Sequence, residues 1–382
     1  MKSTLKEKAL IVYLEGRITS VNAKELETQI FEALQTSHEE VIIDFSHLEY
    51  ISSAGLRVIL RVRKKEANLR CVELSPEVYE IFVMTGFIEL MPVEKAFEKV
   101  SIEGCKQIGK GANGLVYKLN EEEIVKVYKN PDSLEDIYRE KELAKTAFIL
   151  GIPTAISFNV VKVGDLYGAK YEMLNADSLV ACLQKNKIDV DTCVEMSVDI
   201  MKTMHESFVE EGKMPPIKAI YAKKMQEIQP YLPEDTYQKS AKMFDEIPEP
   251  LSIVHGDFHF KNILVQDTEA LLIDMDTLCT GYPIFEFIPI YTAYVGHGEL
   301  DPAVIEKFMS LPYKTTKEIW KKTLQAYFSK SIEENEKKIQ LLAYIRLLDR
   351  EIRKSQREEY ISHYRECIIK LTEELDNLLL VY

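Results

Sequence analysis

The sequence predicts a protein of two parts, an α/β domain at the N-terminus followed by a larger α+β domain with two lobes. Three observations support this fold class. The chain has 382 residues, whereas a single hydrophobic core stops growing near about 250–300 residues. Strand-like and helix-like segments alternate at short spacing through residues 1–100, and the pattern then changes. We therefore expect a first domain over residues 1–100 and two lobes of the second over residues 101–175 and 176–382.

Six elements are expected in the first domain. The expected strands share runs of apolar residues, and the expected helices share apolar residues on one face or a Ser-Pro start. In chain order these elements are a strand over 8–16, a helix over 21–34, a strand over 41–45, a helix over 53–65, a strand over 68–74 and a helix over 75–87. This alternation is typical of a small α/β domain.

The second domain changes from strand-like to helical sequence along its length. Its first lobe is rich in strand-like runs, and its second lobe follows the helical period except for short apolar strands near residues 251–280. Residues 332–381 are expected to be fully helical, because Leu341, Ile345 and Leu348 fall on one stripe.

Composition and charge exclude several classes of function. Lys and Arg total 48 against 62 Asp and Glu, a net charge of −14, which is the wrong sign for nucleic-acid binding. No run approaches the about 18 apolar residues that span a bilayer, so we expect no membrane insertion. The six cysteines include no C-x-x-C pair. A cytoplasmic location is therefore expected.

Two serines stand at an expected strand-to-helix turn in the string EYISSAGLRVIL. The simplest interpretation is that Ser52 or Ser53 caps the helix, since the first backbone N–H groups of a helix need an acceptor. A phosphate on Ser53 would also be stabilised there by the helix N-terminus.

The first domain resembles the STAS domain of anti-sigma-factor antagonists over most of residues 1–100. The resemblance is carried by LEGRITSVNAKELE, VIIDFSHLEYIS and SPEVYEIFVMTGF. Matched through the Gly55-Leu56 pair, Ser53 falls on the position that the family phosphorylates, and Ser52 replaces the Asp that often precedes it. The resemblance implies a mixed sheet with helices, a regulatory phosphosite at Ser53 and a protein partner.

A glycine-rich stretch opens the second domain. Gly109, Gly111 and Gly114 in IGKGANGLVYKL follow the G-x-G-x-x-G order, which fits either a dinucleotide site or a kinase lid over ATP phosphates. A dinucleotide site would continue into a helix, but here a second strand-like run, EIVKVY, follows a polar turn. The context therefore favours the kinase lid.

A lysine and a glutamate follow with the spacing of a phosphate-binding ion pair. Lys126 lies within the EIVKVY strand, where it would reach the α and β phosphates, and Lys118 and Lys129 are the competing candidates. On the next expected helix Glu140 would hold the lysine in position, with Glu142 as the alternative.

The connection between the two lobes is expected at YEMLNADSL. Backbone groups of Glu172 and Leu174 would bind an adenine edge there. This assignment depends on position along the chain alone.

The strongest motif is LSIVHGDFHFKNILV followed by LLIDMDTLCTG. Asp257 and Asn262 match the D-x-x-x-x-N spacing of a catalytic loop, and Asp274 follows twelve residues later on an apolar strand. Phosphoryl transfer requires a carboxylate that orients the acceptor hydroxyl, and Mg²⁺ bridging the phosphates. Asp257 would be that carboxylate, while Asn262 and Asp274 would bind the metal and Asp276 would assist.

The second domain resembles the aminoglycoside phosphotransferase and choline-kinase-like superfamily over about residues 101–300. HGDFHFKN and IDMD stand where protein kinases carry their HRD and DFG forms. The twelve residues between Asp274 and Glu286 leave no room for a long activation loop. The resemblance implies a two-lobed protein-kinase-like fold, ATP as donor with GTP as the alternative, Mg²⁺, and a small-molecule acceptor.

Three functions are compatible with the sequence. The first is a phosphotransferase that acts on the hydroxyl of a small molecule and is regulated or docked through its STAS-like domain. The second is a protein kinase or autokinase of a partner-switching pathway, which would phosphorylate Ser53 or a partner. The third is a nucleotide-sensing pseudokinase, against which the complete set of Asp257, Asn262 and Asp274 argues.

Overall fold

A computed structural model describes residues 1–111 and 113–382. The chain divides into two compact units, Met1–Ser101 with Val161–Gly164 and Ile102–Val160 with Asp165–Tyr382. Each unit has its own hydrophobic core and is described by itself. Within the part of the chain that the structure describes, no helix combines the length and apolar character needed to cross a bilayer.

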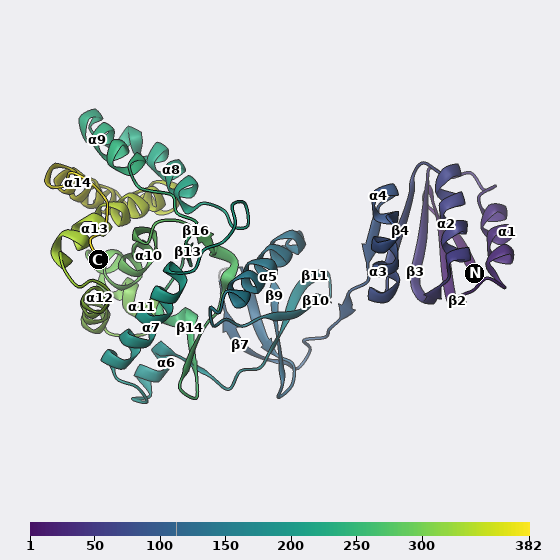
Figure 1. Cartoon of the computed structure of the whole chain (residues 1–382), viewed down its shortest axis with the longest axis horizontal. Coiled ribbons are helices and arrows are strands. Elements are labelled where there is room, and N and C mark those ends of the chain that lie inside the picture. The colour runs from purple at the N-terminus through teal and green to yellow at the C-terminus, as the bar shows by residue number, and fades with distance from the viewer. Residues whose placement is uncertain (112) are drawn as a thin grey trace. The chain divides into compact units, whose positions relative to one another are not determined.

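The first unit is a five-stranded mixed sheet with four helices (Figure 1). The strand order is β1-β2-β3-β4-β5; β1 is antiparallel to β2 and the other pairs are parallel. The strands are β1 (Lys2–Lys6), β2 (Ala9–Ile18), β3 (Glu40–Ile51), β4 (Leu69–Leu74) and β5 (Val93–Lys95), and β6 (Glu98–Lys99) pairs with Val161 and Lys162 of the same unit. The helices are α1 (Ala23–Ala33), α2 (Ser53–Lys65), α3 (Pro76–Met84) and α4 (Phe87–Leu90). The predicted α/β fold with a mixed sheet is confirmed.

Two elements of the first unit differ from the prediction. β3 continues to Ile51, well beyond the predicted end at residue 45, because its second half still pairs with β2. The predicted helix over 75–87 is divided into α3 and α4 at Gly86, whose φ of 74° is left-handed. Glycine adopts this conformation without the steric cost that a side chain would add.

The second unit begins with a sheet in the order β10-β11-β9-β8-β7, beside which α5 lies in Figure 1. The strands are β7 (Lys106–Lys110), β8 (Gly114–Lys118), β9 (Glu123–Tyr128), β10 (Ser157–Val163) and β11 (Leu166–Glu172), and the helix is α5 (Leu134–Ile149). The predicted strand-rich first lobe is therefore present. β9 lies between β8 and β11, so its side chains are supported from both sides.

The rest of the second unit is mainly helical. Its helices are α6 (Leu179–Gln184), α7 (Val190–His205), α8 (Ile217–Ile228), α9 (Glu234–Asp245), α10 (Ile284–Tyr294), α11 (Pro302–Met309), α12 (Tyr313–Tyr327), α13 (Ile332–Arg350) and α14 (Glu358–Glu374). Short strands form two small sheets: β12 (Asp177–Ser178), β14 (Ile263–Gln266) and β15 (Glu269–Leu272), and β13 (Ile253–Val254) with β16 (Cys279–Thr280). Every residue of α10 is buried, so this helix is the centre of the core.

The prediction that residues 332–381 are fully helical is wrong. α13 ends in a π-helical turn over Glu351–Ser355, Gln356 is left-handed with a φ of 51°, and α14 follows. The segment after α14 is not helical. No Gly or Pro marks this break, so no local signal in the sequence pointed to it.

Candidate functional site

Lys126 on β9 contacts two carboxylates from distant parts of the second unit. Its Nζ donates to Glu140 Oε1 at 2.9 Å, to Glu140 Oε2 at 3.1 Å and to Asp274 Oδ1 at 2.7 Å. Only 14% of the Lys126 side chain and 6% of the Glu140 side chain are exposed. Burial by itself would lower the pKa of Lys126, but the carboxylates of Glu140 and Asp274 raise it above its ordinary value. Lys126 is therefore a fixed cation between the two lobes.

The competing residues lie elsewhere. Lys118 pairs with Glu121 at 2.7 Å, and Lys129 donates to a backbone carbonyl of the glycine-rich loop at 2.9 Å. Glu142 pairs with Lys145 at 3.6 Å on an exposed part of α5. Of the alternatives weighed from the sequence, the structure brings together the preferred lysine and glutamate.

Two tyrosines that the sequence analysis did not identify complete this ion pair. Tyr128 Oη donates to Glu140 Oε2 at 2.5 Å, and Tyr171 Oη donates to Glu140 Oε1 at 3.4 Å. These bonds fix the buried carboxylate, whose desolvation would otherwise be costly. Tyr128 is two residues after Lys126 and therefore on the same face of β9, which is the one sequence signal that pointed to it.

The predicted glycine-rich loop is a tight turn between β7 and β8. Gly111 N donates to Gly114 O at 2.9 Å. A Cβ on Gly114 would lie 2.7 Å from the carbonyl oxygen of Val127, so this position requires glycine, and a Cβ on Gly109 would press on Val116 at 3.2 Å. Ala112, at the middle of the loop, lies outside the described residues.

The loop that carries Asp257 is held in place by hydrogen bonds to Glu286 of α10. Glu286 is fully buried and accepts hydrogen bonds from the backbone of His255 at 2.5 Å and of Gly256 at 3.2 Å. Asn262 Nδ2 donates to Asp257 O at 3.0 Å and closes the loop. The Asp257 side chain is 42% exposed, so an acceptor can reach it.

Three carboxylates meet beside Lys126. Oxygen atoms of Glu140, Asp274 and Asp276 lie within 4.8 Å of one another. Burial and the nearby Asp274 and Glu140 raise the pKa of Asp276 to about 6, and Asn113 of the glycine-rich loop donates to Asp276 at 2.7 Å. Carboxylate oxygens are the ligands that Mg²⁺ prefers, and a cation would relieve their repulsion. Both oxygens of Glu140 accept from Lys126, so Asp274 and Asp276 are the carboxylates of this group that fit Mg²⁺.

Asn262, the other predicted metal ligand, has a side-chain oxygen that is available to bind a metal. Its backbone carbonyl accepts from Ile273 N at 3.0 Å, which joins the Asp257 loop to the segment that leads from the end of β15 at Leu272 to Asp274. Among the described residues, none donates a hydrogen bond to Asn262 Oδ1. Asp274 itself has a left-handed φ of 65°, a conformation that Asp tolerates better than bulkier residues.

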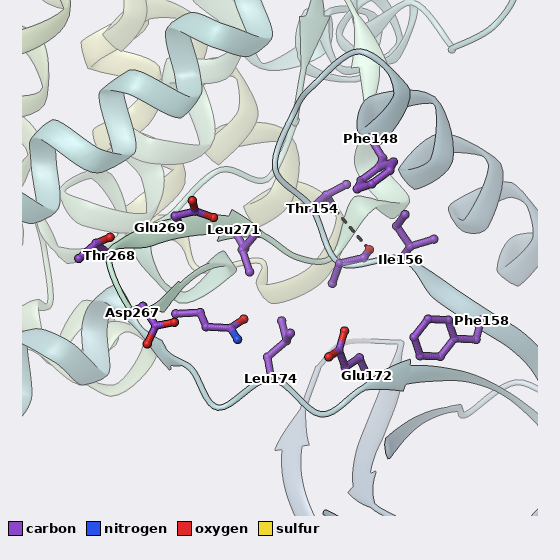
Figure 2. Close-up of a pocket in the computed structure, with 12 residues that line it drawn as sticks. Phe148, Thr154, Ile156, Phe158, Glu172, Leu174, Asp267, Thr268, Glu269 and Leu271 are labelled. Carbon is purple, nitrogen blue, oxygen red and sulfur yellow. Dashed lines mark hydrogen bonds between the residues drawn. The ribbon is translucent and has the colours of Figure 1, made fainter. Parts of the chain in front are cut away.

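Glu172 is the last residue of β11, and Leu174 lies in the segment that follows this strand. Their side chains line a pocket of about 540 Å³, together with Phe148, Thr154 and Glu269 (Figure 2). Lys126 is not among the residues that line this pocket. The adenine prediction concerns backbone groups, and the N–H of Leu174 has no hydrogen-bond partner among the residues that the structure describes.

Comparison with protein families identifies both parts of the chain. The STAS domain profile matches residues 2–100. The profile of the phosphotransferase enzyme family matches residues 104–310, more than half of the chain. The chain belongs to the phosphotransferase enzyme family and carries an N-terminal STAS domain. Both resemblances stated from the sequence are confirmed.

The STAS domain has curated relatives. It is 39% identical over 93 residues to BtrV of Bordetella bronchiseptica, named as a candidate anti-sigma factor antagonist; the match covers 23% of this chain and 80% of BtrV. It is 27% identical over 89 residues to the anti-sigma F factor antagonist of Paenibacillus polymyxa, covering 22% of this chain and 76% of that protein.

Solved structures similar to the chain include two kinds of kinase. One is the ADP-bound aminoglycoside phosphotransferase APH(2'')-Ib, which is 16% identical in sequence and gives a TM-score of 0.48. The match covers 72% of this chain and 94% of that chain. Another is a choline/ethanolamine kinase family protein from Mesorhizobium loti, which is 13% identical in sequence and gives a TM-score of 0.44. The match covers 70% of this chain and 88% of that chain.

Ser53 of the STAS domain is the first residue of α2 and is exposed. The cap is Ser52, whose Oγ accepts from Gly55 N at 3.3 Å, so of the two serines the structure assigns the capping role to Ser52. The Ser53 hydroxyl is therefore not needed to cap the helix.

Arg346 of the phosphotransferase domain was not identified from the sequence. It extends from α13, and its Nη2 lies 4.0 Å from Asp257 Oδ1. No motif marks this arginine, since α13 lies beyond the region that the family profile matches. It is the cationic side chain nearest to the predicted catalytic carboxylate among the described residues.

Proposed function

We propose that the phosphotransferase domain transfers the γ-phosphoryl group of ATP, with Mg²⁺, to a hydroxyl of a small molecule. We further propose that the STAS domain docks a protein partner or regulates the enzyme; GTP is the alternative donor. The observation that carries the proposal is the contact of Lys126 with both Glu140 and Asp274. In kinases of this fold, an ion pair between a lysine and a glutamate holds the phosphate-binding lysine in position.

Each residue has a defined task in the proposed reaction. Lys126 binds the α and β phosphates, and Asn262 and Asp274 would hold Mg²⁺, which would neutralise part of the negative charge of the nucleotide. Asp257 orients the acceptor hydroxyl and takes its proton. A bond forms between the acceptor oxygen and the γ phosphorus, the bond from that phosphorus to the bridging oxygen breaks, and ADP leaves with the electron pair.

The segment after Asp274 favours a small acceptor over a protein. Only a single 3₁₀ turn (Met275–Thr277) and the two-residue strand β16 lie between Asp274 and the start of α10 at Ile284. A regulated protein kinase places a long activation loop here. The short segment leaves the Asp257 loop directly accessible.

The proposal is tested by product analysis with ATP, Mg²⁺ and a pool of hydroxyl-bearing metabolites. We expect ADP and a phosphomonoester in equal amounts, and no transfer without Mg²⁺. ATP binding without any transfer would contradict the proposal and would favour a nucleotide-sensing protein.

The exposure of Ser53 supports a second candidate, an autokinase that modifies its own STAS domain. In that case, incubation with ATP and Mg²⁺ should add one phosphate to the chain, abolished by Ser53→Ala. Ser52→Ala is the matched control, because it removes the cap but leaves the predicted phosphosite. An unchanged intact mass would eliminate this candidate.

A further inference from the structure

The end of α13 and the turn that follows it are strongly basic, in contrast to the rest of the chain. Residues 346–357, RLLDREIRKSQR, contain five Lys and Arg against two Asp and Glu, a net charge of +3. The whole chain has a net charge of −14. This segment also contributes Arg346, the residue that lies beside Asp257.

Arg346 is held in place but still accessible. Its Nη1 donates to Tyr221 Oη at 3.5 Å, and its Nη2 lies 4.0 Å from Asp257 Oδ1, too far for a hydrogen bond. The exposed fraction is 30% for the Arg346 side chain and 42% for Asp257. Arg346 therefore has N–H donors left for a ligand that also touches Asp257.

The acidic side chains of the segment are already neutralised by other cations. Asp349 is buried and accepts from Arg353 Nε at 2.7 Å and from Lys224 at 3.2 Å. Glu351, also buried, accepts from Arg357 Nε at 3.0 Å. Both carboxylates bind other cations directly, and among the described residues Asp257 is the one carboxylate within ion-pair distance of Arg346.

A second basic side chain without a carboxylate partner among the described residues, that of Arg350, lies one helical turn further along α13. It donates to His297 Nε2 at 2.7 Å, and among the described residues no carboxylate lies within ion-pair distance of it. Burial and the neighbouring guanidinium groups of Arg350, Arg346 and Arg357 lower the pKa of His297 to about 3. His297 is therefore neutral at pH 7 and leaves the charge of Arg350 uncompensated.

We propose that the acceptor carries an oxyanion, a phosphate or a carboxylate, and that Arg346 binds it while Asp257 holds the hydroxyl to be phosphorylated. This inference rests on the proposed function and narrows its substrate class. A guanidinium matches the planar geometry of both oxyanions and can donate two parallel hydrogen bonds. Arg350 adds a longer-range attraction. A cationic acceptor would instead meet like charge beside Asp257.

The test divides the low-molecular-weight metabolites of a cell extract on ion exchangers into cationic, neutral and anionic pools. Each pool is supplied to the full chain with ATP and Mg²⁺, and transfer is measured as ADP plus phosphorylated product. We expect transfer in the anionic pool. Glycerate and glycerol 3-phosphate, compared with glycerol, then distinguish a carboxylate from a phosphate as the bound group.

The matched variants are Arg346→Gln, Arg346→Lys and Lys321→Gln. Arg346→Gln is expected to raise the half-saturating acceptor concentration roughly tenfold to a hundredfold, since it removes a hydrogen bond between charged groups. Arg346→Lys should restore part of this loss. Lys321→Gln removes the same charge from an exposed position of α12 and should change nothing. The KM for ATP should stay constant throughout, which separates acceptor binding from nucleotide binding.

The outcomes distinguish this inference from the proposed function. Transfer confined to the neutral or cationic pool, or an Arg346→Gln variant with unchanged acceptor affinity, would overturn the oxyanion inference and leave the kinase intact. No transfer in any pool despite ATP binding would overturn both. Loss of ATP affinity in Arg346→Gln would assign the arginine to the nucleotide and overturn the inference alone.

Discussion

Replacing Asp257 by alanine is expected to lower turnover by about 10² to 10⁴, the usual range for loss of a general base. Asp257→Asn should be nearly as inactive, because the amide keeps the shape but cannot accept the proton. The KM for ATP should change little, since Asp257 is predicted to touch the acceptor and not the nucleotide. Steady-state ADP release with an accepted substrate measures both quantities.

The fold should tolerate this substitution, which makes the experiment informative. The Asp257 carboxylate is 42% exposed, and its contacts with His259 at 3.7 Å and Arg346 at 4.0 Å are long. The loop is held instead by Glu286 and by the amide of Asn262. The melting temperature of Asp257→Ala should therefore match that of the unmodified protein. Unchanged turnover in a folded variant would remove Asp257 from the catalytic machinery.

The parts of the site that sequence analysis located are those in which a short motif encodes the chemistry. Asp257 and Asn262 are five residues apart on one loop, and their spacing alone predicts that they act together. Lys126 and Asp274 are 148 residues apart, yet each lies in a motif of fixed order, so their meeting could also be expected. The α/β alternation of the first domain followed from local periodicity, and the kinase-like fold of the second from its resemblance to the phosphotransferase superfamily.

The parts that sequence analysis missed depend on contacts without a motif. Arg346 reaches Asp257 from a helix 89 residues further along the chain, and nothing in its surrounding sequence distinguishes it from a solvated arginine. The break at Gln356 was missed for a related reason, since the apolar stripe continues to Ile352 without a Gly or Pro. In both cases tertiary packing, not local propensity, determines the position.

Replacing Lys126 by methionine is expected to lower kcat/KM by roughly 10² to 10³, comparable to the loss of one donor to a developing phosphate charge. The variant should also be less stable. Glu140 is only 6% exposed, and removing its cation leaves a buried carboxylate supported by Tyr128 and Tyr171 alone. Breaking a buried pair in this way costs up to about 3–5 kcal/mol. Kinetics with varied ATP and thermal unfolding of the same samples measure the two effects.

Glu140→Gln and the double variant determine whether the pair acts as a unit. Lys126 keeps Asp274 as a partner in Glu140→Gln, so this variant should lose less activity than Lys126→Met. In the double variant the buried charge is absent, and stability should recover relative to Lys126→Met, giving a coupling free energy of about 0.5–3 kcal/mol. Lys118→Met is the matched control, because Lys118 pairs with Glu121 and was one of the two competing candidates. Equal losses in Lys118→Met and Lys126→Met, or strictly additive effects in the double variant, would show that Glu140 does not position the phosphate-binding lysine.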